Sequence, residues 1–469
     1  MSNELIYSDA TKLAELIRTR EVSPVEVMKA HLDRIEVVNP KVNAIVTIAE
    51  DAMKSAREAE DAVQRGDELG PLHGVPFTAK DSIDTARVQT QRGTPIFKGR
   101  TPDTDATSVA RMKKAGAILR AKTNLPEFTY GIESDNLLTG RTNNPWNLDL
   151  TPGGSSGGES AAIAAGMSPL GLGTDLAISL RGPAAHTGIV SLKATHGRVP
   201  MTGIWPREPR RFWHVGPMAR SIRDLSLAFS QLVGSDGQDG YSSSAIPFDY
   251  GTDSSSKRAL RVGWLVEPGF GPVDPETAAT VQAAAVALKD FGHVVESVRI
   301  PALERDFALD VFTRLHVLEM KPGFVKTTAG RSENEIGDMA RFMLSLPDTP
   351  PADYIDAAQA AERLKDGYAE YFQKYDVLLT PVIPTPSFKH GQAELLINGQ
   401  TVNIMGLMSA TTPLSVTGLP GVSMRFGTSH DGMPIGVQIV GNWQAESTIL
   451  HVASLLEQVS PVRDLHPSL

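Results

Sequence analysis

The sequence predicts an α/β protein in which helices cover a β-sheet on both faces. Strand-like apolar segments recur along the chain, and residues 260–298 read strand, helix, strand. This order favours a right-handed crossover between strands, which places helices on the faces of the sheet. Hydrophobic residues make up 41% and charged residues 21% of the 469 residues, as is typical of a globular protein with a sizeable core.

The N-terminal elements carry clear start signals. The segment Ser23-Pro24-Val25-Glu26 offers an N-cap serine, a proline at the first helical position and a glutamate three residues after the cap, so a helix begins here. Residues 50–64 are rich in Ala, Glu, Lys and Arg and predict a second helix, closed by a glycine. Short apolar runs at 75–77 and 117–121 predict strands, separated by a helix around residues 109–111.

The second half of the chain repeats this alternation. It predicts four strands, at residues 260–266, 293–298, 376–379 and 435–440. Helices are predicted from about 274 to 292 and from 446 to 456. A Gly/Ser-rich stretch over 234–256 reads as a surface linker, yet strand-like segments continue on both sides of it. We therefore interpret residues 1–469 as one domain with an inserted helical portion at about 300–370.

Composition excludes several functional classes. The chain has no cysteine, so disulfides, thiolate metal sites and a cysteine nucleophile are ruled out. The net charge of −9, without a basic block, argues against nucleic acid as a direct partner. The first residues do not resemble a leader peptide, and no apolar run is long enough to cross a membrane, so we expect a soluble cytoplasmic protein that does not bind membranes.

The most unusual segment is the glycine- and serine-rich run over residues 151–162, TPGGSSGGESAA. Taken alone, such a run is most often a flexible loop. A phosphate-binding loop is disfavoured because no lysine follows the glycines and no G-x-G-x-x-G pattern is present here. Two further features change this interpretation: Lys80 at a predicted strand end upstream, and the segment Asp175-Leu176-Ala177-Ile178-Ser179-Leu180-Arg181 just downstream.

In this order of features the chain resembles the amidase signature family. Other segments that resemble the family follow in order over nearly the whole chain: NAI at 43–45, TNLPEF at 123–128, NNPW at 143–146, GPMAR at 216–220, YDVLLTP at 375–381 and PIGVQ at 434–438. The resemblance implies a large mixed β-sheet covered by helices on both faces. It also implies a hydrolase that cleaves C–N bonds and needs no cofactor.

The resemblance assigns the catalytic trio to Lys80, Ser155 and Ser179, with a cis peptide bond between Gly154 and Ser155. The residue types suit the chemistry, because a serine hydroxyl is a poor nucleophile unless a base removes its proton as it attacks. A lysine can be that base only when it is neutral, which burial or a neighbouring cation can bring about. Ser155 would relay the proton from Ser179 to Lys80 and return it to the leaving amine.

The loop that carries Ser179 supplies the remaining expected groups. We expect the backbone N–H groups of Leu176, Ala177, Ile178 and Ser179 to bind the oxyanion, where one such donor is commonly worth about 3–4 kcal/mol. Asp175 and Arg181 flank the nucleophile, and we interpret them as an ion pair that holds the loop; a surface salt bridge of little energetic value is the alternative. Ser156 is interpreted either as a hydrogen-bond partner of the lysine region or as a small residue in a tight turn.

The chain departs from the family at Ala177 and Ile178, where two glycines are usual. A side chain at Ile178 adds bulk beside the oxyanion site, but backbone donors do not depend on side-chain identity, so we expect activity with a reshaped acyl pocket.

Four bulky or charged residues of the segment 204–213 are candidates for the substrate cleft: Trp205, Arg207, Phe212 and Trp213. The apolar stretch 404–408 is another candidate, although core packing is the favoured interpretation.

Two other patterns contain residue types of catalytic or metal sites but do not predict such a site. Ser429-His430-Asp431 contains the residue types of a catalytic triad, but three adjacent residues cannot adopt the required geometry, so a turn is predicted. The isolated histidines show no ligand spacing, and no metal is expected: His73, His186, His196 and His214.

Three functions remain open on the sequence. The leading one is a free-standing amidase, either a monomer or a homodimer, that acts on small amides, anilides, esters or carbamates. The loop at Ser179 and the segment 204–213 are somewhat similar to those of family members that accept urethanes and anilides. The alternatives are a glutaminase subunit of a transfer-RNA amidotransferase and a catalytically silent binding module, which the Ala177-Ile178 departure motivates.

Overall fold

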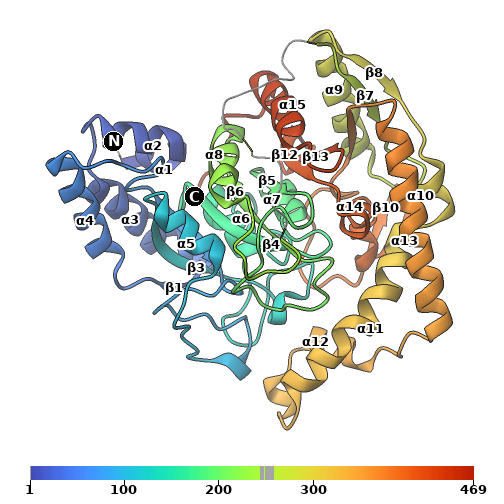
Figure 1. Ribbon diagram of the computed structural model, residues 1–469, viewed down its shortest axis with the longest axis horizontal. Coiled ribbons are helices and arrows are strands. Elements are labelled where there is room, and N and C mark those ends of the chain that lie inside the picture. Colours follow the sequence, from blue (N-terminus) through green and yellow to red (C-terminus); the bar gives the residue numbers. More distant parts are fainter. Residues whose placement is uncertain (1, 243–247, 249–257) are drawn as a thin grey trace.

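The computed structural model describes residues 2–242, 248 and 258–469, and its centre is an 11-stranded mixed sheet (Figure 1). The strand order is β1-β3-β2-β4-β6-β5-β12-β13-β9-β7-β8. The bounds of these strands in chain order are β1 (Ile45–Ile48), β2 (Pro76–Lys80), β3 (Ile118–Thr123), β4 (Leu170–Asp175), β5 (Val190–Lys193), β6 (His214–Ala219), β7 (Arg261–Trp264), β8 (Val294–Ser297), β9 (Val377–Pro381), β12 (Gly421–Thr428) and β13 (Pro434–Gly441). A separate hairpin joins β10 (Glu394–Ile397) to β11 (Gln400–Asn403).

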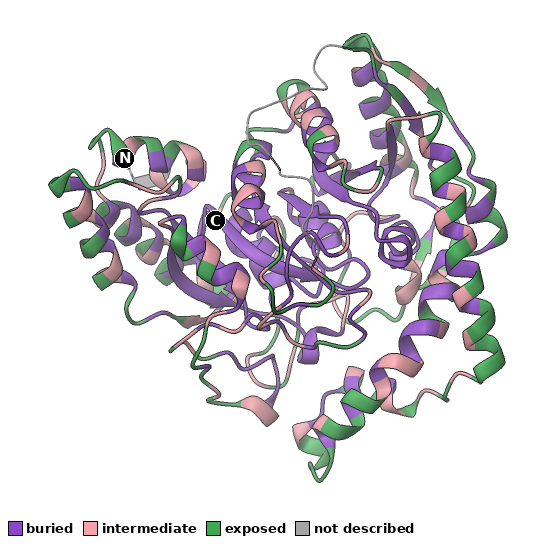
Figure 2. Cartoon of the chain, in the orientation of Figure 1, coloured by how far each residue is buried: buried purple, intermediate pink, exposed green. Residues whose placement is uncertain are grey.

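Helices cover both faces of the sheet, as the sequence predicts. Their bounds are α1 (Ser2–Tyr7), α2 (Ala10–Arg18), α3 (Pro24–Val42), α4 (Ala52–Arg65), α5 (Thr107–Lys114), α6 (Gly157–Ala164), α7 (Arg181–Thr187), α8 (Ile222–Leu232), α9 (Pro275–Asp290), α10 (Pro301–Arg305), α11 (Ala308–Thr328), α12 (Asp338–Ser345), α13 (Pro351–Phe372), α14 (Thr412–Thr417) and α15 (Glu446–Val459). Every residue of α6 and α7 is buried, whereas α4 and α13 expose one side to solvent (Figure 2).

Local signals in the sequence place several of these elements correctly. Ser23 caps α3 through a complete capping box with Glu26, and Gly66 closes α4 in the left-handed conformation at φ 77°. The predicted strand–helix–strand unit is observed as β7, α9 and β8, and its two strands are parallel. The predicted segments at 376–379 and 435–440 correspond to β9 and β13.

Helices α10 to α13 occupy the predicted helical portion between β8 and β9. They form the lower right part of the molecule in Figure 1, where α11 packs on α13 and α14. Strands from both halves of the chain enter one sheet, which is consistent with a single domain that carries this insertion; that division of the chain stays a prediction. The predicted linker at 234–256 falls largely outside the described residues.

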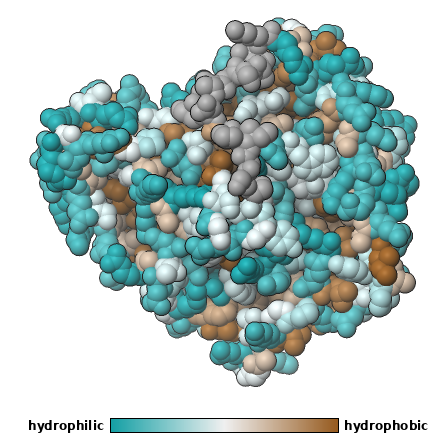
Figure 3. Space-filling view, viewed as in Figure 1, coloured by the Kyte–Doolittle hydropathy of each residue, from teal (hydrophilic) through white to brown (hydrophobic). Residues whose placement is uncertain are grey.

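The face shown in Figure 3 is mainly hydrophilic, with hydrophobic residues in small scattered groups. In the described part of the chain, no helix is both long enough and apolar enough to cross a membrane. The topology positions the site that follows, because β2 and β4 are parallel neighbours and their carboxyl ends therefore lie at the same edge of the sheet.

Candidate active site

Lys80, the last residue of β2, is completely buried among hydroxyl groups. Its Nζ atom lies 2.6 Å from Ser155 Oγ, 3.0 Å from Ser156 Oγ and 3.0 Å from Thr174 Oγ1. Burial lowers the pKa of Lys80 well below its ordinary value of 10.5, although Asp175 and Glu159 act in the opposite direction. A neutral amine has a lone pair, so in that state one of these hydroxyls can donate its proton to Nζ.

The loop that carries Ser155 is held by close backbone packing. The peptide bond between Gly154 and Ser155 is cis, as the family resemblance implies. A Cβ atom on Gly154 would lie 2.7 Å from backbone atoms of Gly131 and Glu133, so only glycine fits this position. Ser134 Oγ accepts a hydrogen bond from the N–H of Gly157 at 3.0 Å and donates one to the carbonyl oxygen of Gly153 at 3.1 Å. The loop is thus fixed against the segment that contains Ser134.

Ser156 bridges the lysine and the next strand. In addition to its contact with Lys80, its hydroxyl donates to the carbonyl oxygen of Thr174 at 3.1 Å. This geometry corresponds to the first of its two interpretations, a hydrogen-bond partner of the lysine region. Thr174 itself, the third hydroxyl at Lys80, was missed in the sequence; its position next to Asp175 in β4 is the signal that was available.

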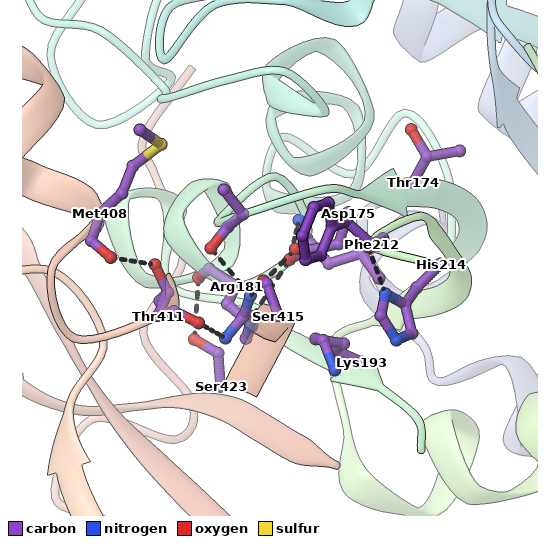
Figure 4. Close-up of polar contacts among 12 residues, drawn as sticks. Thr174, Asp175, Arg181, Lys193, Phe212, His214, Met408, Thr411, Ser415 and Ser423 are labelled. Carbon is purple, nitrogen blue, oxygen red and sulfur yellow. Dashed lines mark hydrogen bonds and ion pairs between the residues drawn. The ribbon is translucent and has the colours of Figure 1, made fainter. Parts of the chain in front are cut away.

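Asp175 and Arg181 form a completely buried ion pair at 2.9 Å (Figure 4). Burial alone would raise the pKa of Asp175, but Arg181 and the N–H of Leu180 hold it below its ordinary value. Arg181 also donates to the carbonyl oxygens of Ala177 at 2.9 Å and Thr411 at 2.8 Å. The pair therefore ties both ends of the loop 175–181 together and fastens it to the segment before α14.

Ser179 lies on this loop and is 5% exposed. The N–H of Ser156 donates to the carbonyl oxygen of Ser179 at 3.3 Å, so the two serine loops lie against each other. Within the described residues the Ser179 hydroxyl makes no hydrogen bond, and no acceptor takes the backbone N–H groups of Leu176, Ala177, Ile178 and Ser179. These N–H groups are consequently available to a bound anion next to the Ser179 hydroxyl.

Beside Ser179 lies a cavity of about 170 Å³ with apolar walls. Leu176, Ala177 and Ile178 form one side of it, and Ile178 packs so tightly on Gly182 that a Cβ atom there would lie 2.7 Å from its Cγ1. The other walls come from the segment after β3, from α11, from α12 with the residue that follows it, and from the turn before α14: Thr129, Tyr130, Gly131, Ile132, Phe312, Thr313, His316, Val317, Met339, Phe342, Met343, Leu346, Met405 and Met408.

The four predicted cleft residues lie elsewhere. Phe212 and Trp213 are buried in the core, where Phe212 packs against Phe312 and Trp213 against Tyr130 at ring-centroid distances of 5.2 and 6.0 Å. Trp205 lines a separate groove with Phe97 and Phe128, and Arg207 lines a polar depression. Large aromatic side chains gain more from the core than from the cleft rim that we expected for them.

Conversely, most residues that line the cavity were not candidates in the sequence. Met405 and Met408 of the segment 404–408 do line it, the less favoured of the two interpretations of that stretch. The contributions of α11 and α12 carried no motif, because a lone histidine or methionine on a helix is normally a core residue. Only the packing of α11 and α12 near the loop that carries Ser179 identifies them.

The remaining sequence patterns have structural roles. Residues 429–432 form the turn between β12 and β13, in which Ser429 Oγ accepts from the N–H of Met433 and His430 pairs with Glu276 at 2.9 Å. In the described ranges, no three His, Asp or Glu side chains are grouped so that they could hold a metal ion.

Comparison with known proteins gives a consistent result. The family model described as Amidase matches residues 26–450. Two curated relatives are, by name, subunits of glutamyl-tRNA(Gln) amidotransferases. The protein from Carboxydothermus hydrogenoformans is 33% identical, over 99% of this chain and 100% of its own. The protein from Acidothermus cellulolyticus is 34% identical, over 97% and 95%.

Solved structures with the same fold include hydrolases of small amides. The 6-aminohexanoate cyclic dimer hydrolase complexed with substrate is 29% identical, with a TM-score of 0.88 over 99% of each chain. A bacterial aryl acylamidase of the amidase signature family is 26% identical, with a TM-score of 0.87 over 97% of this chain and 96% of its own.

Proposed function

The chain belongs to the amidase family, and from this premise we propose that it is a free-standing hydrolase of small amides with an apolar acyl group. The observation that carries this proposal is the apolar cavity beside Ser179, next to a lysine that burial drives towards its neutral form. Anilides and carbamates are the substrate classes that we place first, because both present a carbonyl group that Ser179 can attack.

In the proposed reaction, Ser179 Oγ attacks the carbonyl carbon while its proton passes through Ser155 to Lys80 Nζ. The 2.6 Å separation between Ser155 and Lys80 suits the second part of this transfer. The free N–H groups of residues 176–179 stabilise the oxyanion, and the side chains of Ala177 and Ile178 do not interfere with backbone donors. Collapse returns the proton to the leaving nitrogen, and water then hydrolyses the acyl-enzyme, or the carbamoyl-enzyme when the substrate is a carbamate.

The two halves of the substrate are proposed to lie on different sides of Ser179. The leaving nitrogen has to receive its proton from Ser155, so it lies on the side of Ser155 and Lys80. Neither of these two residues is among those that line the apolar cavity. The cavity is therefore assigned to the acyl group, whose burial there is favourable by roughly 0.8 kcal/mol per CH₂ group.

A glutaminase subunit of an amidotransferase is the second candidate, and the names of the curated relatives favour it. Glutamine would place an α-ammonium and an α-carboxylate near Ser179, and both charges need partners when they are buried. The described residues that line the cavity include no Asp, Glu, Lys or Arg. This cavity suits an apolar acyl group better than glutamine, which is why the free-standing enzyme is our first proposal.

The test measures release of p-nitroaniline from a short-chain acyl anilide and from the matching carbamate, and release of ammonia from glutamine, by wild type and Ser179→Ala. We expect turnover of the anilide, the carbamate or both by wild type, and a loss of at least about 10³-fold in the variant. Turnover of glutamine alone would establish the glutaminase. Failure on all three, together with no labelling of Ser179 by a fluorophosphonate, would establish the silent binding module.

A further inference from the structure

His316 brings a polar ring into the apolar cavity beside Ser179. It lies on α11 and is 4% exposed. No charged side chain faces it across the cavity, because the described lining has no Asp, Glu, Lys or Arg. Phe312 stacks on its ring at a centroid distance of 5.0 Å, and the Tyr130 ring lies 5.3 Å away. The imidazole is therefore held in one orientation by two aromatic neighbours that also line the cavity.

Hydrogen bonds determine which nitrogen of His316 carries the proton. Burial lowers the pKa of His316 to about 3, so the ring is neutral and has one N–H and one acceptor nitrogen. The Tyr130 hydroxyl lies 3.2 Å from His316 Nε2. A phenol O–H is a stronger hydrogen-bond donor than an imidazole N–H, and an imidazole nitrogen is a stronger acceptor than a phenol oxygen. The Tyr130 O–H therefore donates to Nε2, which leaves the ring proton on Nδ1.

Only Nε2 of the ring has a hydrogen-bond partner among the described residues, so the Nδ1–H group has no acceptor there. A donor without an acceptor beside an apolar cavity is unfavourable, and a substrate oxygen that reached it would supply the missing hydrogen bond. We propose that His316 determines specificity within the reaction proposed above: its Nδ1–H donates a hydrogen bond to an oxygen, such as a ketone, in the otherwise apolar acyl group. The favoured substrate is thus an amide whose acyl chain carries one internal hydrogen-bond acceptor.

The experiment compares matched pairs of p-nitroanilides. One member is the hexanoyl anilide, and the other carries a ketone in place of one CH₂ group, with each chain position tested in turn. The specificity constant kcat/KM is measured for wild type, His316→Phe and His316→Asn, because phenylalanine removes the donor while the asparagine amide keeps one near the Nδ1 position. Met343→Leu serves as a control that alters an apolar wall without changing its polarity.

We expect wild type to prefer one ketone position by about tenfold over the hexanoyl compound, the value of one hydrogen bond. His316→Phe should lose this preference, His316→Asn should keep part of it, and Met343→Leu should leave it unchanged. Each preference is a ratio within one variant, so partial misfolding does not alter it.

Two results would overturn the inference while leaving the proposed function intact: turnover by wild type without preference at any position, or a preference that His316→Phe retains. If His316→Phe slowed both members equally, the residue would only pack the cavity wall. If wild type hydrolysed no member of any pair, the proposed function itself would fail, and the inference with it.

Discussion

In the proposed reaction, the protonation state of Lys80 decides whether Ser179 can lose its proton. Three hydroxyl oxygens surround Nζ and would accept hydrogen bonds from a charged ammonium, while complete burial opposes that charge. The outcome is a pKa well below 10.5, so the neutral base becomes available at a pH where a solvent-exposed lysine is still charged.

The first prediction concerns the acid limb of the pH–activity profile. Because the neutral form is the active one, kcat/KM should rise with pH through the lowered pKa of Lys80 and reach its plateau well below pH 10.5. Thr174→Val removes a hydroxyl that stabilises the charged form, so the limb should move to lower pH. Thr277→Val, at a buried threonine with an unbonded hydroxyl, should leave the profile unchanged. A limb near pH 10 in wild type would contradict the proposed role of Lys80.

Arg181 holds the loop 175–181, which carries Ser179, in place. Its guanidinium group contacts Asp175, Ala177 and Thr411 and is excluded from solvent. Removal of this group would leave the Asp175 carboxylate buried without a cation, which is far less favourable than loss of an exposed pair.

The second prediction is that Arg181→Met lowers the free energy of unfolding by about 3–5 kcal/mol, measured by urea titration. The matched control is Arg299→Met, which removes an exposed pair with Glu304 and should leave the titration unchanged. Equal effects of the two substitutions would mean that the buried pair is not what holds the loop.

At the scale of elements, α12 forms one wall of the cavity. It packs mainly on α11 and on the segment around Glu127. The Glu127 carboxylate accepts hydrogen bonds from Thr94 Oγ1 at 2.8 Å and from the N–H of Gly337, just before α12, at 2.7 Å. A Cβ atom on Gly337 would lie 2.6 Å from this carboxylate, so a larger residue there would push the Glu127 side chain away. Glu127 therefore positions the helix that brings Met339 and Phe342 to the cavity.

The third prediction is that Glu127→Ala raises KM for an apolar anilide by roughly fivefold, the equivalent of about 1 kcal/mol, with little change in kcat. The reason is that the cavity wall is loosened while the catalytic groups stay in place. Trypsin should also cut faster after Arg341. Glu335→Ala, in the exposed turn just before α12, is the control and should alter neither quantity. A fall in kcat without a change in KM would contradict this role.

At the scale of the whole molecule, the site combines distant parts of the chain. Lys80 comes from β2, Ser179 follows β4, Arg181 is fastened next to α14, and the cavity is closed by the insertion between β8 and β9. All the groups that the proposed reaction requires therefore come from one chain.

The fourth prediction follows from this arrangement: the purified chain alone should hydrolyse its anilide or carbamate at full rate. Size-exclusion chromatography coupled to the activity assay checks this, with a single peak of monomer or homodimer as the expected result. The contrary result would be glutaminase activity that appears only when partner subunits copurify, which would favour the second candidate.

Some parts of the molecule could be predicted because their signals are local. The capping box at Ser23, the glycine that closes α4 and the strand–helix–strand unit at 261–297 depend on neighbours within a few residues. The order of Lys80, the serine-rich loop and Ser179 was likewise readable, because each lies in a short segment that resembles the family.

By itself, the sequence determined the fold class, the family and the residues proposed for catalysis. Only the tertiary structure decided what surrounds them: the hydroxyl of Thr174 at Lys80, the burial of Phe212 and Trp213 in the core, and His316 in the cavity. The physical reason is that a pocket wall is set by the packing of helices far apart in the chain. A side chain on α11 or α12 has no local pattern that distinguishes a core position from a cavity position.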